Sequence, residues 1–244
     1  MTGTTPPPLF FVHVMKTGGT SFVRRLERLL PAEAIYPDEP QGPARRAAYR
    51  SVSALAALPP ERRAPIRAYV GHFPYVAVEL LAEPVVTATI LRDPVERTIS
   101  YLKHCRVHEP TLHDAPLEAI YDDPWQYPML VRNYQVKLFA MEPADDPESD
   151  MDVVEIDDRR LEVACRNVEA VDLLGLHSHY GDFVAAANRR FGWPDLEVKR
   201  WFESDPAPVS DALRRRIRED NEYDMRFFEH VRRVHDDRAH ASAG

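Results

Sequence analysis

An apolar run that passes through two glycines into an amphipathic helix is the feature that most constrains this fold. Residues 9–14 read LFFVHV, and residues 15–21 read MKTGGTS. Apolar side chains then recur at positions 22, 23, 26, 29 and 30, which is the spacing of a helix with one buried face. The pattern predicts a buried strand, a tight turn at Gly18 and Gly19, and a helix that begins near Thr20.

The turn between this strand and helix has the composition of an anion-binding loop. The first N–H groups of a helix lack intrahelical partners, and the helix dipole adds partial positive charge there. Glycines let the backbone approach an anion closely, and a lysine adds a full charge. We therefore expect phosphate or sulfate to bind here, with a glycine-rich turn that holds no ligand as the alternative. The expected cradle consists of Lys16, Thr17, Gly18, Gly19, Thr20 and Ser21.

A second strand-to-helix junction carries an arginine and a serine at a defined separation. Residues 84–91 read PVVTATIL, which is typical of a buried parallel strand, and residues 92–101 read RDPVERTISY. Because Pro94 suits the first turn of a helix, Arg92 should end the strand and Ser100 should lie two turns into the helix. A guanidinium can bind two phosphate oxygens while a hydroxyl binds a third. We expect Asp93 and Arg97 to form an ion pair beside them.

Together the two junctions resemble the phosphate-binding motifs of sulfotransferases that use 3′-phosphoadenosine 5′-phosphosulfate (PAPS). The KTGGT sequence is similar to the version in the heparan-sulfate 2-O- and 6-O-sulfotransferase branch, and the chain resembles a soluble bacterial relative of it. The resemblance implies that residues 16–21 hold the 5′-phosphosulfate and that Arg92 and Ser100 hold the 3′-phosphate. Lys199 and Arg200 resemble the basic loop that closes over the adenosine bisphosphate, with a solvated pair of charges as the alternative.

Sulfuryl transfer needs a cation at the leaving oxygen and a base for the acceptor hydroxyl. Lys16 is the expected cation, because charge builds on the bridging oxygen as its bond to sulfur breaks. His72 is the expected base, since residues 69–73 read YVGHF and end a predicted strand at the edge where both phosphate loops lie. The family branch has His-Gly-His here, whereas this chain has Val70 in the first position. A structural role for His72 is the alternative, and His104 and His108 are expected on the surface.

Alternating strands and helices predict an α/β fold with a P-loop-like parallel sheet flanked by helices. With 244 residues, of which 44% are hydrophobic, the chain can bury the core of one domain. We expect a single sulfotransferase domain over residues 1–244, in which a last helical region ends near Val234 and residues 1–8 and 236–244 form flexible tails.

Charge and composition restrict the partners. A net charge of −8 disfavours nucleic acid, and the start of the chain lacks the apolar segment of a signal peptide or membrane anchor. Two cysteines indicate no disulfide framework, and no metal-ligand motif stands out. A cytoplasmic enzyme is therefore expected, with no nucleic-acid or membrane partner.

The expected activity is transfer of the sulfuryl group of PAPS to a hydroxyl of a carbohydrate or small-molecule acceptor. A catalytically silent PAPS- or nucleotide-binding protein is the main alternative. A nucleotide-dependent phosphoryl transferase is disfavoured, because the P-loop motif G-x-x-x-x-G-K-[ST] places its lysine after the glycines. The sequence specifies neither the acceptor nor the oligomeric state.

Overall fold

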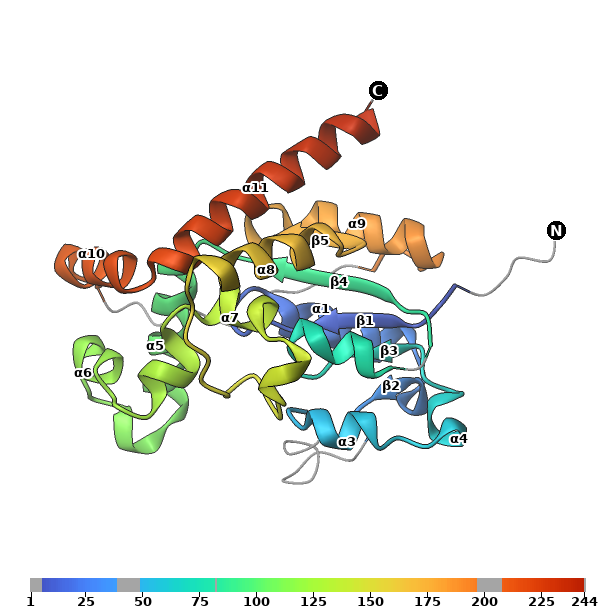
Figure 1. Cartoon of the computed structure of the whole chain (residues 1–244), viewed down its shortest axis with the longest axis horizontal. Helices are drawn as coiled ribbons and strands as arrows, with labels where there is room; N and C mark the ends of the chain where they lie inside the picture. Colours follow the sequence, from blue (N-terminus) through green and yellow to red (C-terminus); the bar gives the residue numbers. More distant parts are fainter. Residues whose placement is uncertain (1–5, 39–48, 82, 197–207, 244) are drawn as a thin grey trace.

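A computed structural model describes residues 6–38, 49–81, 83–196 and 208–243. Its centre is a five-stranded parallel sheet with the strand order β2-β3-β1-β4-β5 (Figure 1). The strands are β1 (Leu9–Val12), β2 (Ile35–Tyr36), β3 (Ala68–Tyr69), β4 (Val86–Leu91) and β5 (Leu173–Leu176). Neighbouring strands run parallel throughout this sheet, with Leu9 facing Ala68 on one side and Val86 on the other. The predicted α/β domain with a parallel sheet flanked by helices is confirmed.

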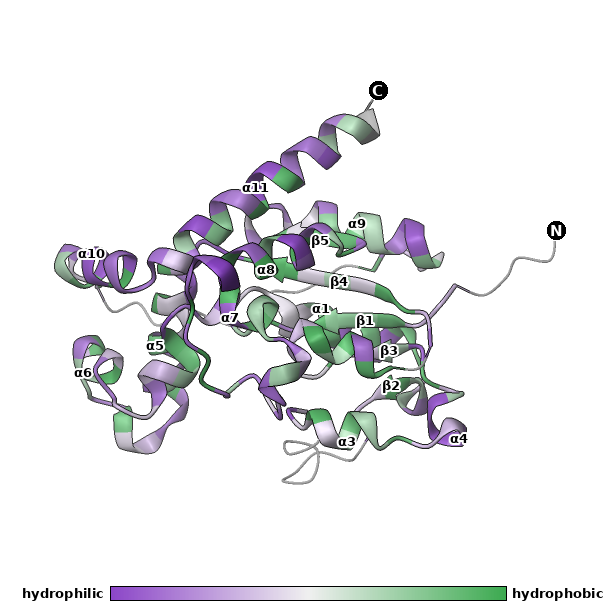
Figure 2. Ribbon diagram, viewed as in Figure 1, coloured by the Kyte–Doolittle hydropathy of each residue, from purple (hydrophilic) through white to green (hydrophobic). Residues whose placement is uncertain are grey.

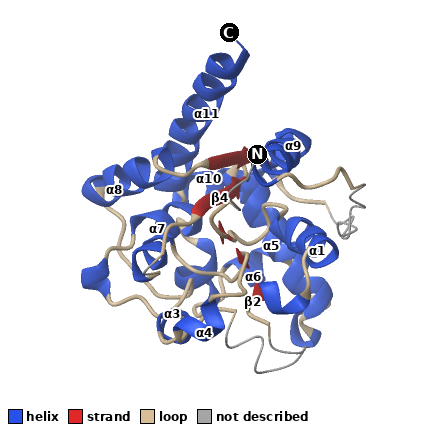
Figure 3. Cartoon of the chain, turned by 90° about the vertical axis from the view of Figure 1, so that its right-hand side faces the viewer, coloured by secondary structure: helices blue, strands red, loops and turns tan. Residues whose placement is uncertain are grey.

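Helices follow the strands as crossover connections and cover both faces of the sheet (Figure 3). They are α1 (Gly19–Leu29), α3 (Val52–Ala56), α4 (Pro60–Arg63), α5 (Pro94–His108), α6 (Leu117–Tyr121), α7 (Tyr134–Ala140), α8 (Asp158–Glu169), α9 (Tyr180–Phe191), α10 (Asp211–Asp220) and α11 (Glu222–Ala243). Short 3-10 turns include Tyr75–Leu80 after β3 and His177–His179 after β5, and a π-turn spans Tyr127–Val131.

The side chains of β1 alternate between two apolar clusters. Leu9 and Phe11 pack with residues of α1 and α9, whereas Phe10 and Val12 pack with residues of α5, α7, α8 and α11. All four β1 residues are completely buried. A strand enclosed on both faces has no polar side, which is why the sequence shows a continuous apolar run rather than an alternating one.

The end of the chain differs from the sequence-based prediction. Instead of one helical region that ends near Val234, α10 stops at Asp220 and α11 continues through Ala243. Arg238 explains the extension, because its guanidinium donates to the carbonyls of Glu169 and Val171 at 2.6 and 2.7 Å. Residues 236–243 of the predicted tail at 236–244 are therefore helical, and residues 1–5 of the other predicted tail, at 1–8, lie outside the described residues.

The part of α11 that projects from the body consists mostly of hydrophilic residues (Figure 2). Within the described ranges, no helix combines the length and the apolar character that crossing a membrane requires.

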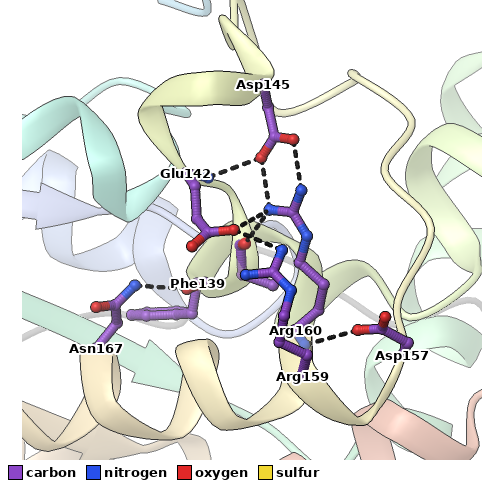
Figure 4. A network of polar contacts seen from close by, with 8 residues as sticks. Phe139, Glu142, Asp145, Asp157, Arg159, Arg160 and Asn167 are labelled. Carbon is purple, nitrogen blue, oxygen red and sulfur yellow. Dashed lines mark hydrogen bonds and ion pairs between the residues drawn. The ribbon is translucent and has the colours of Figure 1, made fainter.

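A charged network fastens α8 to the end of α7 (Figure 4). Arg160 makes two hydrogen bonds of 2.6 Å with Asp145, and Arg159 donates to Glu142 at 2.7 Å. Asn167 donates to the Phe139 carbonyl at 2.8 Å. The network fixes the carboxyl end of α7, a helix whose first turn reaches the site described next.

Candidate functional site

The loop between β1 and α1 forms a backbone cradle at the carboxyl edge of the sheet. Gly18 precedes the first helical residue at a φ of 100°, a conformation that favours glycine, and Lys16 is also left-handed at 68°. The helix starts at Gly19, close to the predicted Thr20. Gly18 supplies no side-chain cap to the first turn of α1, and helix N-termini of this kind favour an anion as partner for their first N–H groups.

The hydroxyl of Thr17 does not face the ligand, although Thr17 was expected to bind the donor. Thr17 is completely buried, and its hydroxyl donates to the Val14 carbonyl at 2.9 Å. This hydroxyl is therefore committed to shaping the loop. Thr20 and Ser21, at the start of α1, keep partial exposure as a ligand-facing role requires.

The two predicted phosphate motifs lie in contact. Arg92 follows β4, and its Nη1 donates to the main-chain oxygen of Lys16 at 3.2 Å. Ser100 lies in α5, eight residues after Arg92, and is partly buried. Parallel strands bring their carboxyl ends to one edge, so residues 76 positions apart in the sequence share one site.

Gln135 holds the backbone of Arg92 in place. The Gln135 amide accepts from the Arg92 N–H at 3.1 Å and donates to the Arg92 carbonyl at 2.8 Å, and only 1% of the side chain is exposed. Asp224, at the start of α11, in turn accepts from the N–H groups of Gln135 and Val136 at 3.2 and 2.7 Å. The first turn of α7 is thus clamped between Arg92 and α11.

Arg97 does not form the predicted ion pair with Asp93. Asp93 instead caps α5 by accepting from the Glu96 N–H at 3.0 Å. Arg97 is completely buried and donates to the carbonyls of Met15 and Leu130 at 3.2 and 2.5 Å, with its guanidinium 4.1 Å from the centre of the Tyr134 ring. The prediction failed because the Asp93 carboxylate is used to cap the first turn of α5, and the long Arg97 side chain extends instead to the loop before α1.

Positive charge is concentrated around Lys16. Burial, with the charges of Arg97 and Arg92 acting in the same direction, lowers the pKa of the Lys16 ammonium to about 8. Burial also lowers the pKa of Arg92. A pKa lowered by neighbouring cations means that an anion placed among them is attracted by all of them.

His72 follows β3 and is oriented by backbone groups. Its Nδ1 lies 2.7 Å from the His13 carbonyl, and because a carbonyl can only accept, Nδ1 carries the proton. The Nε2 atom therefore holds a lone pair. The pKa of His72 is lowered to about 3, chiefly by burial and also by the charges of Arg50 and Arg97, while the bond to His13 acts in the opposite direction.

The same edge of the sheet also carries His104 of α5, together with His177 and Tyr180 after β5. His104 of α5 is partly buried, with its ring 4.2 Å from that of His108. Burial, followed by the Lys16 charge, lowers the pKa of His104 to about 4, and this side chain is partly buried rather than fully on the surface as predicted. A Cβ on Gly18 would lie 3.4 Å from both His177 and Tyr180. The loops after β1, β3, β4 and β5 therefore converge.

Two of the predicted contacts are not described. Lys199 and Arg200, expected against the adenosine bisphosphate, lie outside the described residues. Within the part of the chain that the structure describes, no three His, Cys, Asp or Glu side chains gather in a way that could hold a metal ion.

Comparisons with known proteins add no family to this geometry. No family model matches the chain, and no curated protein is significantly similar to it. Function therefore has to be argued from the site itself.

Proposed function

We propose that this protein is a PAPS-dependent O-sulfotransferase that acts on a hydroxyl of a carbohydrate or small molecule. The observation that carries the proposal is the 3.2 Å contact between Arg92 and the Lys16 backbone, which joins two phosphate-binding motifs in one site. PAPS has a phosphosulfate and a separate 3′-phosphate, so it needs two anion sites at the edge of one sheet. The sequence resemblance assigns the cradle to the first and Arg92 with Ser100 to the second.

In the proposed reaction the acceptor oxygen attacks sulfur, and the bond between sulfur and the bridging oxygen breaks. The electron pair of that bond stays on the bridging oxygen, so adenosine 3′,5′-bisphosphate leaves. Lys16 stabilises the charge that develops on this oxygen. The proton of the acceptor hydroxyl passes to Nε2 of His72, whose lone pair is kept available by the bond from Nδ1 to His13.

A pKa of about 3 makes His72 a weak base in the ligand-free protein. The bound donor counters this, because its negative charges stand near the cations that lower the pKa. The same low pKa favours a second candidate function, a PAPS-binding protein without turnover, if bound ligand leaves the proton affinity of His72 unchanged.

Transfer can be tested by incubating the protein with PAPS and a panel of saccharides and small alcohols. Mass spectrometry should detect a sulfated acceptor together with an equal amount of adenosine 3′,5′-bisphosphate. His72→Asn should bind PAPS normally and form no product, because an amide cannot accept the proton. Tight PAPS binding without product from any acceptor would favour the silent binding protein.

A further inference from the structure

His13 touches both halves of the site, although neither proposed motif includes it. It lies one residue beyond β1, is 4% exposed, and belongs to the segment that leads into the cradle. Its ring is buried, and Nδ1 makes no hydrogen bond of good geometry among the described residues, although the ring interacts with the backbone of Val70. A buried ring nitrogen with at best a poorly aligned partner destabilises the fold, so an imidazole here needs a reason beyond filling space.

On one side, the His13 ring fixes the position of the cradle. A Cβ on Gly19 would lie 2.2 Å from Cδ2 and 2.5 Å from Nε2 of His13, far closer than atoms can approach. The ring also lies 5.5 Å from the Phe11 ring, which packs against α1 through Phe22. The first residue of α1 can therefore occupy its position only because it is a glycine resting on this imidazole.

On the other side, His13 holds His72 in two ways. The rings stack with centroids 4.3 Å apart and planes inclined by 30°, and the main-chain oxygen of His13 accepts the proton of His72 Nδ1 at 2.7 Å. The stack restricts rotation of the imidazole, and the hydrogen bond selects its tautomer. Tyr49 completes the enclosure. Its ring lies 5.5 Å from that of His72, and its carbonyl oxygen accepts from the backbone N–H of His72 at 2.6 Å.

We propose that His13 is a positioning residue that makes the phosphate cradle and His72 one mechanical unit. A displacement of the cradle moves the His13 ring, and a displacement of that ring removes the support that aligns His72. Occupation of the cradle by an anion thus fixes the orientation of the base as well as the donor. The inference rests on the proposed function for its catalytic meaning, whereas the coupling itself is a property of the ligand-free protein.

The coupling can be measured without any substrate, in protein labelled with ¹⁵N at its histidines. Long-range ¹H–¹⁵N spectra distinguish a protonated ring nitrogen from one with a lone pair, and His72→Asn assigns the signals of His72. The wild type should show a single tautomer with the proton on Nδ1. His13→Ala keeps the main-chain oxygen that accepts from Nδ1, so the tautomer should persist, but it removes the stacked ring and should shift and broaden the ring signals of His72. His13→Asn serves as a second variant should alanine unfold the protein.

Gly19→Ala tests the other half of the unit, because the His13 ring is the nearest group to its new methyl group and would have to move. It should also change the His72 signals. Gly181→Ala is the matched control, since a Cβ there meets nothing within 4 Å, and it should leave the signals as they are in the wild type. Unchanged His72 signals in folded His13 variants or in folded Gly19→Ala would overturn the proposal, as would an equal change in Gly181→Ala.

Turnover supplies a second readout where transfer activity is found. His13→Ala should lower kcat by a factor on the order of 10², the effect of a misplaced catalytic group, while KM for PAPS changes little. Failure of wild-type protein to bind adenosine 3′,5′-bisphosphate would count against the proposed function. The response of the His72 ring signals to Gly19→Ala would still decide whether cradle and His72 are coupled.

Discussion

Replacing Gln135 should weaken recognition of the 3′-phosphate although this residue is not expected to touch the ligand. In Gln135→Leu the N–H and carbonyl of Arg92 both lose their partner, and leaving a buried polar group unpaired costs about 1–3 kcal/mol. Arg92 is partly buried, so water can reach part of its backbone, and we expect the free energy of unfolding to fall by about 2 kcal/mol in total.

The loss of affinity follows from the freedom that Arg92 gains. A hydrogen bond between a guanidinium and a phosphate contributes about 1.5–3 kcal/mol, and losing half of it corresponds to roughly tenfold in Kd. Titration calorimetry should show this loss for adenosine 3′,5′-bisphosphate and less than about twofold for adenosine 5′-monophosphate, which lacks the 3′-phosphate.

Asn167→Leu is the matched control for Gln135→Leu. It removes an amide that donates to the Phe139 carbonyl at the far end of the same helix, at 2.8 Å. It should lower stability, measured by chemical denaturation, and leave the affinity for both nucleotides unchanged. If Gln135→Leu folds and binds the two nucleotides with the wild-type ratio of affinities, the hydrogen bonds from Gln135 to the Arg92 backbone do not position Arg92 for the 3′-phosphate.

Three other changes give independent tests. Lys16→Ala should lower kcat more than it weakens PAPS binding, and a loss of affinity at unchanged kcat would make the lysine a binding residue only. Because the pKa of Lys16 is about 8, affinity for adenosine 3′,5′-bisphosphate should fall as the pH rises from 7 to 9, and Lys16→Ala should remove this step. His72→Ala should lower kcat by a factor on the order of 10²–10⁴. His104→Ala should leave kcat close to that of the wild type. If kcat instead falls in His104→Ala and is kept in His72→Ala, the base is His104.

The fold could be predicted from the sequence because its signals are local. A continuous apolar run such as residues 9–12 indicates a strand covered on both faces, and the rule that parallel strands share a carboxyl edge places Arg92 near Lys16. The end of α11 was not predictable in this way. Its last turns are held by Arg238 against carbonyls of residues nearly 70 positions away.

The parts of the site that the sequence did not reveal depend on contacts between distant segments. Nothing in the residues around Gln135 indicates that its amide pairs with the backbone of Arg92 across 43 positions. The same holds for Arg97, whose spacing from Asp93 suggested a local pair while its partners are carbonyls of two loops. Residue type and periodicity give the element that carries a group, whereas only the packed structure gives its partner.

Calorimetric titration with adenosine 3′,5′-bisphosphate and with ATP, each with and without Mg²⁺, tests the central claim most directly. The arrangement of Lys16 and Arg92 at two separate anion sites predicts that the bisphosphate binds more tightly than ATP and that Mg²⁺ makes no difference. Equal or tighter binding of ATP that requires Mg²⁺ would contradict the assignment and favour a phosphoryl transferase.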